Sequence, residues 1–122
     1  MSINVKTGYF AQMKKYVAAG YMPIAITASV PVWYKGNSMQ VFAPDWELVQ
    51  DWKSGKITWD EYTERYNSML DRRGISYALK ILEQFENVVL ICYEKPSDKC
   101  HRHLLAEYLN NKYNMNVLEF EI

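Results

Sequence analysis

Two runs of mostly apolar residues, Ile24–Ala28 and Val88–Ile91, lie at the centre of this chain's pattern. Neither run alternates apolar with polar residues, which predicts strands that are covered on both faces. Between them, apolar residues at helical spacing predict three helices: from Ala43–Asp45 to about Ser54, from Thr58 to Gly74, and from Ser76 to Phe85. We therefore predict an α/β domain, with a small, mostly parallel, Rossmann-like sheet flanked by helices and a helical insertion between its two central strands.

The two ends of the chain are predicted to add shorter elements. Ser2–Lys6 is a candidate strand or arm, and Gly8–Ala19 is predicted to be a helix that ends at Gly20, a residue type suited to the position after a helix. Val117–Phe120 is a candidate terminal strand. With 122 residues, of which 49% are apolar, the chain is predicted to form one domain, residues 1–122, around a single core.

The polar loop after Val88–Ile91 carries the residues best suited to chemistry. Apolar residues that recur at helical spacing from about Lys99 onward predict a helix after this loop. In a parallel sheet, such a loop leaves the carboxyl end of a strand, where ligands usually bind. The loop Ser29–Gly36 is expected at the same edge, so the two loops are predicted to share one pocket. The candidate site residues of the later loop are Cys92, Glu94, Cys100, His101 and Arg102.

Charge and cysteine content limit the partners of the chain. Fourteen basic and fourteen acidic side chains cancel, so no global field attracts nucleic acid or an anionic membrane. No apolar run approaches the roughly 18 residues of a membrane span, and the N-terminus lacks the pattern of a signal peptide. We expect a cytoplasmic protein in which Cys92 and Cys100 are free thiols rather than a structural disulfide, with a redox pair as the alternative.

Cys100 and Arg102 are the leading candidates for chemistry. The first helical turn, where Cys100 is expected, has exposed N–H groups that lower a thiol pKa and favour a reactive thiolate; a small buried thiol is the alternative. The planar guanidinium group of Arg102 can donate paired hydrogen bonds to a phosphate or carboxylate. The alternative is an ion pair with Glu94 or Glu107. Proton transfer is assigned to Glu94 or His101.

Four residues in this region are potential zinc ligands: Cys92, Cys100, His101 and His103. We expect no metal ion, because His101 and His103 lie two positions apart on a helix and point about 200° away from each other. No usual zinc spacing is present, and no cofactor is expected. Cys92 is expected to be a core residue at the end of its strand, on the border of the ligand site.

Aromatic residues are concentrated in the first half of the chain. Trp33 and Tyr34 follow the first central strand and are predicted to stack on a base or nucleoside at the pocket, which Ser29 also borders. The aromatic residues on the predicted helices are expected to be core residues instead. These are Trp46, Trp52 and Trp59.

The central loop also matches a family signature. Cys92-x-Glu94, followed by five residues and then Cys100-His101-Arg102, resembles the signature of the domain of unknown function 488 (DUF488) family. Further agreement lies in Lys6–Phe10, in Pro31–Tyr34, in Ala43-Pro44 before a tryptophan-rich helix, and in Glu61-Tyr62 with Tyr66. The resemblance implies a compact α/β domain, found in small bacterial and phage proteins, with the Cys-His-Arg loop at its site, and it implies no particular reaction.

These observations lead to one main functional hypothesis and two alternatives. We expect the pocket to bind a small anionic, nucleotide-like ligand, with Arg102 on the anion and Trp33 or Tyr34 on the base. The first alternative is a thiol-dependent enzyme or redox sensor that uses Cys100, with Cys92 as its resolving partner. The second is a non-enzymatic interaction module whose motif is a structural corner. Whether the protein is an enzyme stays open at this point.

Overall fold

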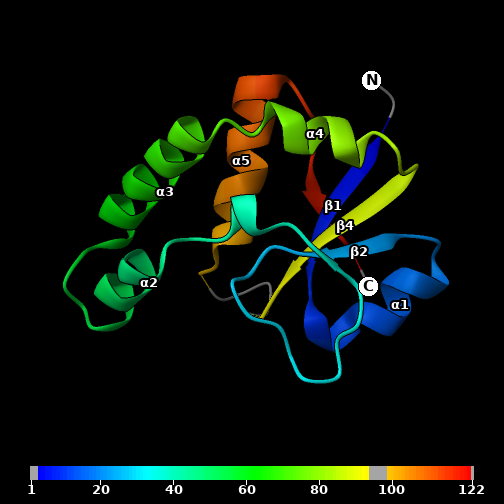
Figure 1. The fold of residues 1–122 in the computed structure, drawn as a ribbon, viewed down its shortest axis with the longest axis horizontal. Coiled ribbons are helices and arrows are strands. Elements are labelled where there is room, and N and C mark those ends of the chain that lie inside the picture. Colours follow the sequence, from blue (N-terminus) through cyan, green and yellow to red (C-terminus); the bar gives the residue numbers. More distant parts are fainter. Residues whose placement is uncertain (1–2, 94–98, 122) are drawn as a thin grey trace.

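One parallel β-sheet forms the centre of the computed structural model, which describes residues 3–93 and 99–121 (Figure 1). Within these residues the sheet has five strands in the order β3-β2-β4-β1-β5, and every neighbouring pair is parallel. The strands are β1 (Asn4–Tyr9), β2 (Met22–Ala25), β3 (Asn37–Ser38), β4 (Asn87–Cys92) and β5 (Leu118–Glu119). This arrangement confirms the predicted α/β fold with a mostly parallel sheet.

The helices connect these strands and cover both faces of the sheet (Figure 1). They are α1 (Met13–Ala18), α2 (Trp46–Lys53), α3 (Trp59–Arg73), α4 (Ser76–Leu82) and α5 (His101–Tyr113), with short 3₁₀ turns at Phe10–Gln12 and Gln40–Phe42. The predicted insertion between the central strands β2 and β4 is confirmed as α2, α3 and α4, and it also contains β3. Thr58 and Glu61 form the predicted capping box at the start of α3, with reciprocal hydrogen bonds of 3.1 and 3.0 Å.

The start of the chain differs from the prediction. The strand β1 extends to Tyr9, where a helix was predicted to begin at Gly8, because residues 4–9 pair along the full length of β4. Gly8 leaves room for the buried ring of Tyr16, against which a Cβ atom would collide. The Tyr16 hydroxyl accepts a hydrogen bond of 3.1 Å from the Tyr9 N–H. Gly8 therefore allows Tyr16 of α1 to pack closely on β1, and it does not start a helix.

Smaller differences occur within the insertion. β3 was not predicted, because a pairing of only two residues with β2 leaves no recognisable pattern in the sequence. Ser76 is the first residue of α4 rather than its cap, a position held by Ile75. Gly20 and Gly74, where helices were predicted to end, follow α1 and α3 with positive φ angles of 88° and 67°. Gly55 follows α2 in the same way, with a φ angle of 78°.

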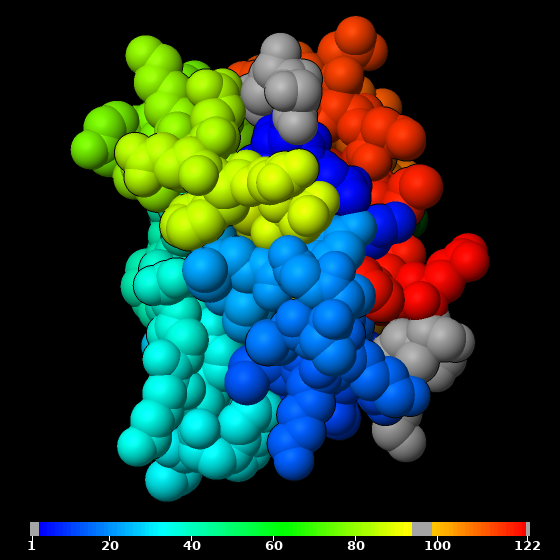
Figure 2. Space-filling model, turned by 90° about the vertical axis from the view of Figure 1, so that its right-hand side faces the viewer, coloured from blue at the N-terminus to red at the C-terminus, as the bar shows by residue number. Residues whose placement is uncertain are grey.

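Alternate residues of the central strands separate the core into two clusters. Val88, Leu90 and Cys92 of β4 pack in the larger cluster, with side chains from α2, α3, α4 and α5. Val89 and Ile91 point to the other face, where they pack with Tyr16 of α1. Figure 2 views the molecule from the side of α1 (blue), next to the segment between β2 and β3 (cyan). The last residue of β4, Cys92, is therefore directed toward α5.

The strand order creates a crevice at the carboxyl edge of the sheet. After β2 the chain turns toward the edge strand β3, and after β4 it turns toward the opposite edge strand β5. Ligands of parallel α/β proteins bind where the connections of neighbouring strands diverge in this way. The carboxyl ends of β2 and β4 are therefore the expected position of a binding site.

Candidate functional site

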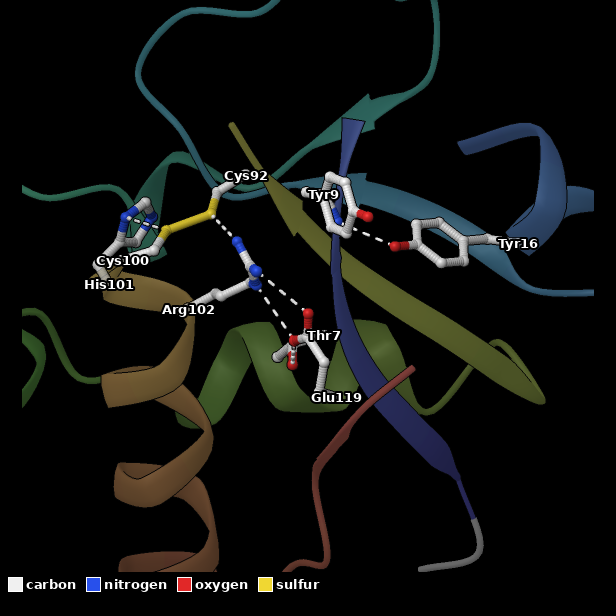
Figure 3. A network of polar contacts seen from close by, with 8 residues as sticks. All are labelled: Thr7, Tyr9, Tyr16, Cys92, Cys100, His101, Arg102 and Glu119. Carbon is white, nitrogen blue, oxygen red and sulfur yellow. Dashed lines mark hydrogen bonds and ion pairs between the residues drawn. A yellow bond between two sulfur atoms is a disulfide. The ribbon is translucent and has the colours of Figure 1, made fainter. Parts of the chain in front are cut away.

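The structure brings Cys92 and Cys100 together at this edge (Figure 3). Cys92 ends β4 and Cys100 is the cap residue before α5, so the strand end faces the helix start. Their sulfur atoms form a disulfide, and both side chains are buried. The prediction of free thiols is therefore wrong. Cys100 also precedes the first helical turn, in which it was expected to lie.

His101 is held in one orientation next to this disulfide. Its Nε2–H donates to the carbonyl oxygen of Ile26 at 2.6 Å, so the unprotonated Nδ1 faces Cys100 Sγ at 3.7 Å. Burial lowers the pKa of His101 from 6.5 to about 4, and the positive charge of Arg102 acts in the same direction. His101 is therefore neutral at pH 7 and presents a nitrogen lone pair to the Cys100 sulfur.

Arg102 forms a buried polar network with Glu119 (Figure 3). Its Nε and Nη2 donate to the two oxygens of the Glu119 carboxylate, each at 3.1 Å, and Nη1 donates to Cys92 Sγ at 2.9 Å. The Thr7 hydroxyl donates to the same carboxylate at 2.6 Å. The network thus links β1, β5, the end of β4 and the first turn of α5.

This network changes the role expected for Arg102. The predicted partners were Glu94 and Glu107, but Glu119 of β5 forms the ion pair; Glu94 lies outside the described residues. The guanidinium is fully buried and turns toward the sheet, so it does not line the cavity described below. The hydrogen bonds of Arg102 among the described residues include those to the Glu119 carboxylate and to the sulfur of Cys92. Its role in binding a ligand anion stays a prediction.

A cavity of about 250 Å³ lies beside the disulfide, at the diverging ends of β2 and β4. Ser29, from the loop after β2, lines it together with Cys100 and His101, so the two predicted loops do share a pocket. Its remaining walls are largely aromatic and come mostly from α2, α3 and the residues around them. The full lining is Thr27, Ala28, Ser29, Pro44, Trp46, Val49, Trp52, Lys53, Trp59, Tyr62, Tyr93, Lys99, Cys100 and His101.

The tryptophans of the helical insertion line this cavity, and two of them, Trp52 and Trp59, also pack against the main core cluster, as predicted. Trp52 and Trp59 have ring centroids 5.0 Å apart, and Trp59 stacks on Tyr62 at 4.7 Å. The Nζ atom of Lys99 lies 5.7 Å from the centroid of Trp52 and 5.8 Å from that of Trp59. Trp46, by contrast, is 75% exposed, so the prediction that it is a core residue is wrong. The sequence pattern placed these rings on helices, but gave no indication that the helix faces border a cavity.

Trp33 and Tyr34, the predicted stacking residues, lie elsewhere. A turn closed by a hydrogen bond of 3.0 Å from the Tyr34 N–H to the Pro31 carbonyl oxygen redirects the chain after β2. Both rings then contact Phe10, with centroid distances of 6.2 Å for Trp33 and 5.3 Å for Tyr34. Tyr34 belongs to the core cluster on the α1 face, opposite the cavity helices. The structure thus assigns Trp33 and Tyr34 to a different face from Cys100 and His101.

These features define a single α/β domain whose candidate site lies at the divergence point of a parallel sheet. A family model described as DUF488-N3a, the active DUF488-N3 subclade, matches residues 17–113. The chain therefore belongs to the DUF488 family. The matched range contains the Cys-His-Arg residues but ends before Glu119.

No curated protein and no solved structure matches the chain. Among the described residues, no helix has both the length and the apolar character needed to span a membrane.

Proposed function

We propose that the chain binds a small, planar, anionic ligand of the nucleotide type in the cavity beside Cys100 and His101. The observation that carries this proposal is the lining itself, in which tryptophan and tyrosine rings occur together with two lysines. A nucleobase gains about 1–3 kcal/mol by stacking on an aromatic side chain. The cavity volume of about 250 Å³ suits a ligand with one base rather than a larger cofactor.

The charge of the lining supports an anionic ligand. Lys53 and Lys99 both border the cavity, and the described residues of its lining include no carboxylate. Lys99 lies over the faces of Trp52 and Trp59, so its ammonium group is close to the surface on which a base would stack. A phosphate attached to that base would therefore have a positive partner within reach.

Tryptophan fluorescence and calorimetry test this proposal with a panel of nucleoside monophosphates, nucleosides and ribose phosphate. Trp52→Ala should weaken nucleotide binding by about 10- to 100-fold, the equivalent of one lost stacking contact. Lys53→Gln should weaken binding of the nucleotides but not of the uncharged nucleosides. Trp33→Ala is the matched control, because it removes the same ring from the other face of the sheet. Absence of nucleotide binding, or equal losses for Trp33→Ala and Trp52→Ala, would refute the proposal.

A second candidate function, thiol–disulfide exchange, is supported by the bonded sulfurs of Cys92 and Cys100. Attack by a thiolate of a partner dithiol on Cys100 would release Cys92 as a thiolate next to Arg102 Nη1, which lies 2.9 Å from its sulfur. The second thiol of the partner then attacks the mixed disulfide, releases Cys100 and leaves the partner oxidised. His101 Nδ1 is placed to accept and return the Cys100 proton.

Mass spectrometry of the protein in glutathione redox buffers tests this second candidate. A reversible transition between disulfide and dithiol, with faster exchange in wild-type protein than in His101→Gln, would support it. A disulfide that strong dithiol reductants leave intact in the folded protein would exclude it.

A further inference from the structure

We propose that Cys92, Cys100 and His101, once the disulfide is reduced, form a binding site for one zinc-type transition-metal ion. The ligand atoms of these three buried residues all lie within 4.8 Å of one another. Two thiolates and one imidazole are a donor set that favours zinc and related ions over magnesium or calcium. The inference does not depend on nucleotide binding, because it rests on a different set of atoms.

His101 already has the orientation of a metal ligand. Its Nε2–H is fixed by the Ile26 carbonyl oxygen at 2.6 Å, which leaves the Nδ1 lone pair directed toward Cys100 Sγ at 3.7 Å. Metal-bound histidines usually donate their second ring N–H in this way, to a backbone carbonyl or a carboxylate. The hydrogen bond to Ile26 therefore selects the tautomer that a metal ion at the cysteines requires.

Arg102 gives the site a second supporting contact, at the other sulfur. Its Nη1 donates to Cys92 Sγ at 2.9 Å, while Nε and Nη2 are held by the Glu119 carboxylate. A guanidinium donates hydrogen bonds and does not accept them, so this contact stabilises Cys92 as a thiolate. Thiolates rather than thiols bind metal ions.

The backbone around the two cysteines suits a pair of metal ligands. Their Cα atoms are 7.6 Å apart, whereas most disulfides span about 4.4–6.8 Å. After reduction, the sulfurs can therefore separate to positions around one ion while β4 and α5 stay in place. Cys100 and His101 also line the cavity, whereas Cys92 is fully buried. Three protein ligands leave a fourth tetrahedral position, and this arrangement directs it toward the cavity.

The disulfide and the metal site exclude each other. A water-soluble phosphine reduces the disulfide to two thiols, and the phosphine becomes a phosphine oxide with oxygen from water. Binding of a divalent ion then displaces the two thiol protons and forms two metal–sulfur bonds. An added small-molecule disulfide, such as oxidised glutathione, accepts two electrons from the metal-bound thiolates and is reduced to two thiolates, while the protein's sulfur–sulfur bond reforms and the ion is released.

Cobalt titration of the full chain tests the site, after phosphine reduction without oxygen. We expect one Co²⁺ per chain, with a thiolate-to-cobalt charge-transfer band and the visible bands of tetrahedral coordination, all removed by added Zn²⁺. The oxidised protein should show none of these bands. Cys100→Ser and His101→Gln should each weaken binding by more than about 10-fold, since even the loss of a supporting contact costs about that much. His103→Gln, at the other histidine of the chain, is the control and should bind as wild type does.

Wild-type protein provides a test that does not depend on the folding of these buried variants. Zn²⁺ should protect Cys100, the cysteine that lines the cavity, from iodoacetamide in the reduced, native protein. A cobalt complex without the charge-transfer band, or equal alkylation rates with and without Zn²⁺, would overturn the proposal. Nucleotide binding is measured on the oxidised protein, so failure of either proposal is recognised separately.

Discussion

Replacing Glu119 by Gln tests whether the buried network around Arg102 stabilises the folded protein. The substitution keeps the shape of the side chain and removes its charge. The Arg102 side chain is 0% exposed, so it cannot exchange the lost carboxylate for water without a change in structure. Glu119→Gln should therefore lower the free energy of unfolding, far more than a substitution at a surface carboxylate.

The size of the effect follows from the geometry. Removal of one partner of a fully buried ion pair costs about 3–5 kcal/mol. Two features reduce this cost: Glu119 is 25% exposed, and glutamine retains an oxygen that can accept from one nitrogen of the guanidinium. We therefore expect a loss of about 2–3 kcal/mol. Thr7→Val, which removes only the hydroxyl donor to Glu119, should cost about 1–2 kcal/mol.

Urea unfolding followed by circular dichroism measures these changes. With a slope of about 2 kcal/mol per M urea, Glu119→Gln should lower the unfolding midpoint by about 1–1.5 M. Glu121→Gln is the control, because it removes an exposed carboxylate two residues away. The double variant of Thr7 and Glu119 should lose less than the sum of the single losses, since both substitutions act on one carboxylate. A Glu119→Gln midpoint that matches the Glu121→Gln midpoint would refute this account of the network.

Three further predictions concern the histidine, a helix start and the packing of β1. The pKa of His101 is about 4 in the folded state and about 6.5 in the unfolded state. The neutral histidine therefore stabilises the folded protein above pH 6.5. This contribution to the free energy of unfolding, about 3 kcal/mol, is lost as the pH falls from 6.5 to 4. In oxidised protein with a chelator, the difference in urea midpoint between wild type and His101→Gln should shrink over that range; a constant difference would contradict the lowered pKa. Thr58→Ala removes the capping box and should lower stability by about 1 kcal/mol, seen as a fall in Tm of about 3–5 °C; an unchanged Tm would show that the box contributes nothing. Gly8→Ala forces the Tyr16 ring to move and should cost about 1–3 kcal/mol by urea unfolding, and the loss should be smaller when Tyr16 is also replaced by Leu; equal losses in both backgrounds would exclude the clash as the cause.

The sheet and the helices between its strands could be predicted because their signals are local. β4 is buried on both faces, so its run of apolar residues is not interrupted, and Thr58 caps α3 through a residue only three positions away. Tyr9 shows the limit of such signals. Its neighbours resemble a helix start, yet pairing with Cys92, far along the chain, holds Tyr9 in β1.

The site was predicted in outline, and its details depend on contacts between distant residues. The position of the Cys-His-Arg loop follows from its place after a strand, but the partner of Arg102 does not. Glu119 reaches Arg102 because β5 pairs with β1. No residue spacing in the sequence indicates this pairing. Similarly, Trp33 and Trp52 are equivalent as residue types. A turn after β2 carries Trp33 to one face of the sheet, and the packing of α2 leaves Trp52 at the cavity on the other.

The place of β1 in the sheet determines when the candidate site is completed during synthesis. β1 precedes the other strands in the chain, but its two neighbours in the sheet are β4 and β5. At about 5–20 residues per second, the ribosome makes β1 on the order of ten seconds before β4, so both edges of this strand stay unpaired for that time. Glu119 of β5 is made later still, and Arg102 has no carboxylate from β5 until then. A nascent chain therefore contains both cysteines and His101 before the complete network that surrounds them in the folded protein.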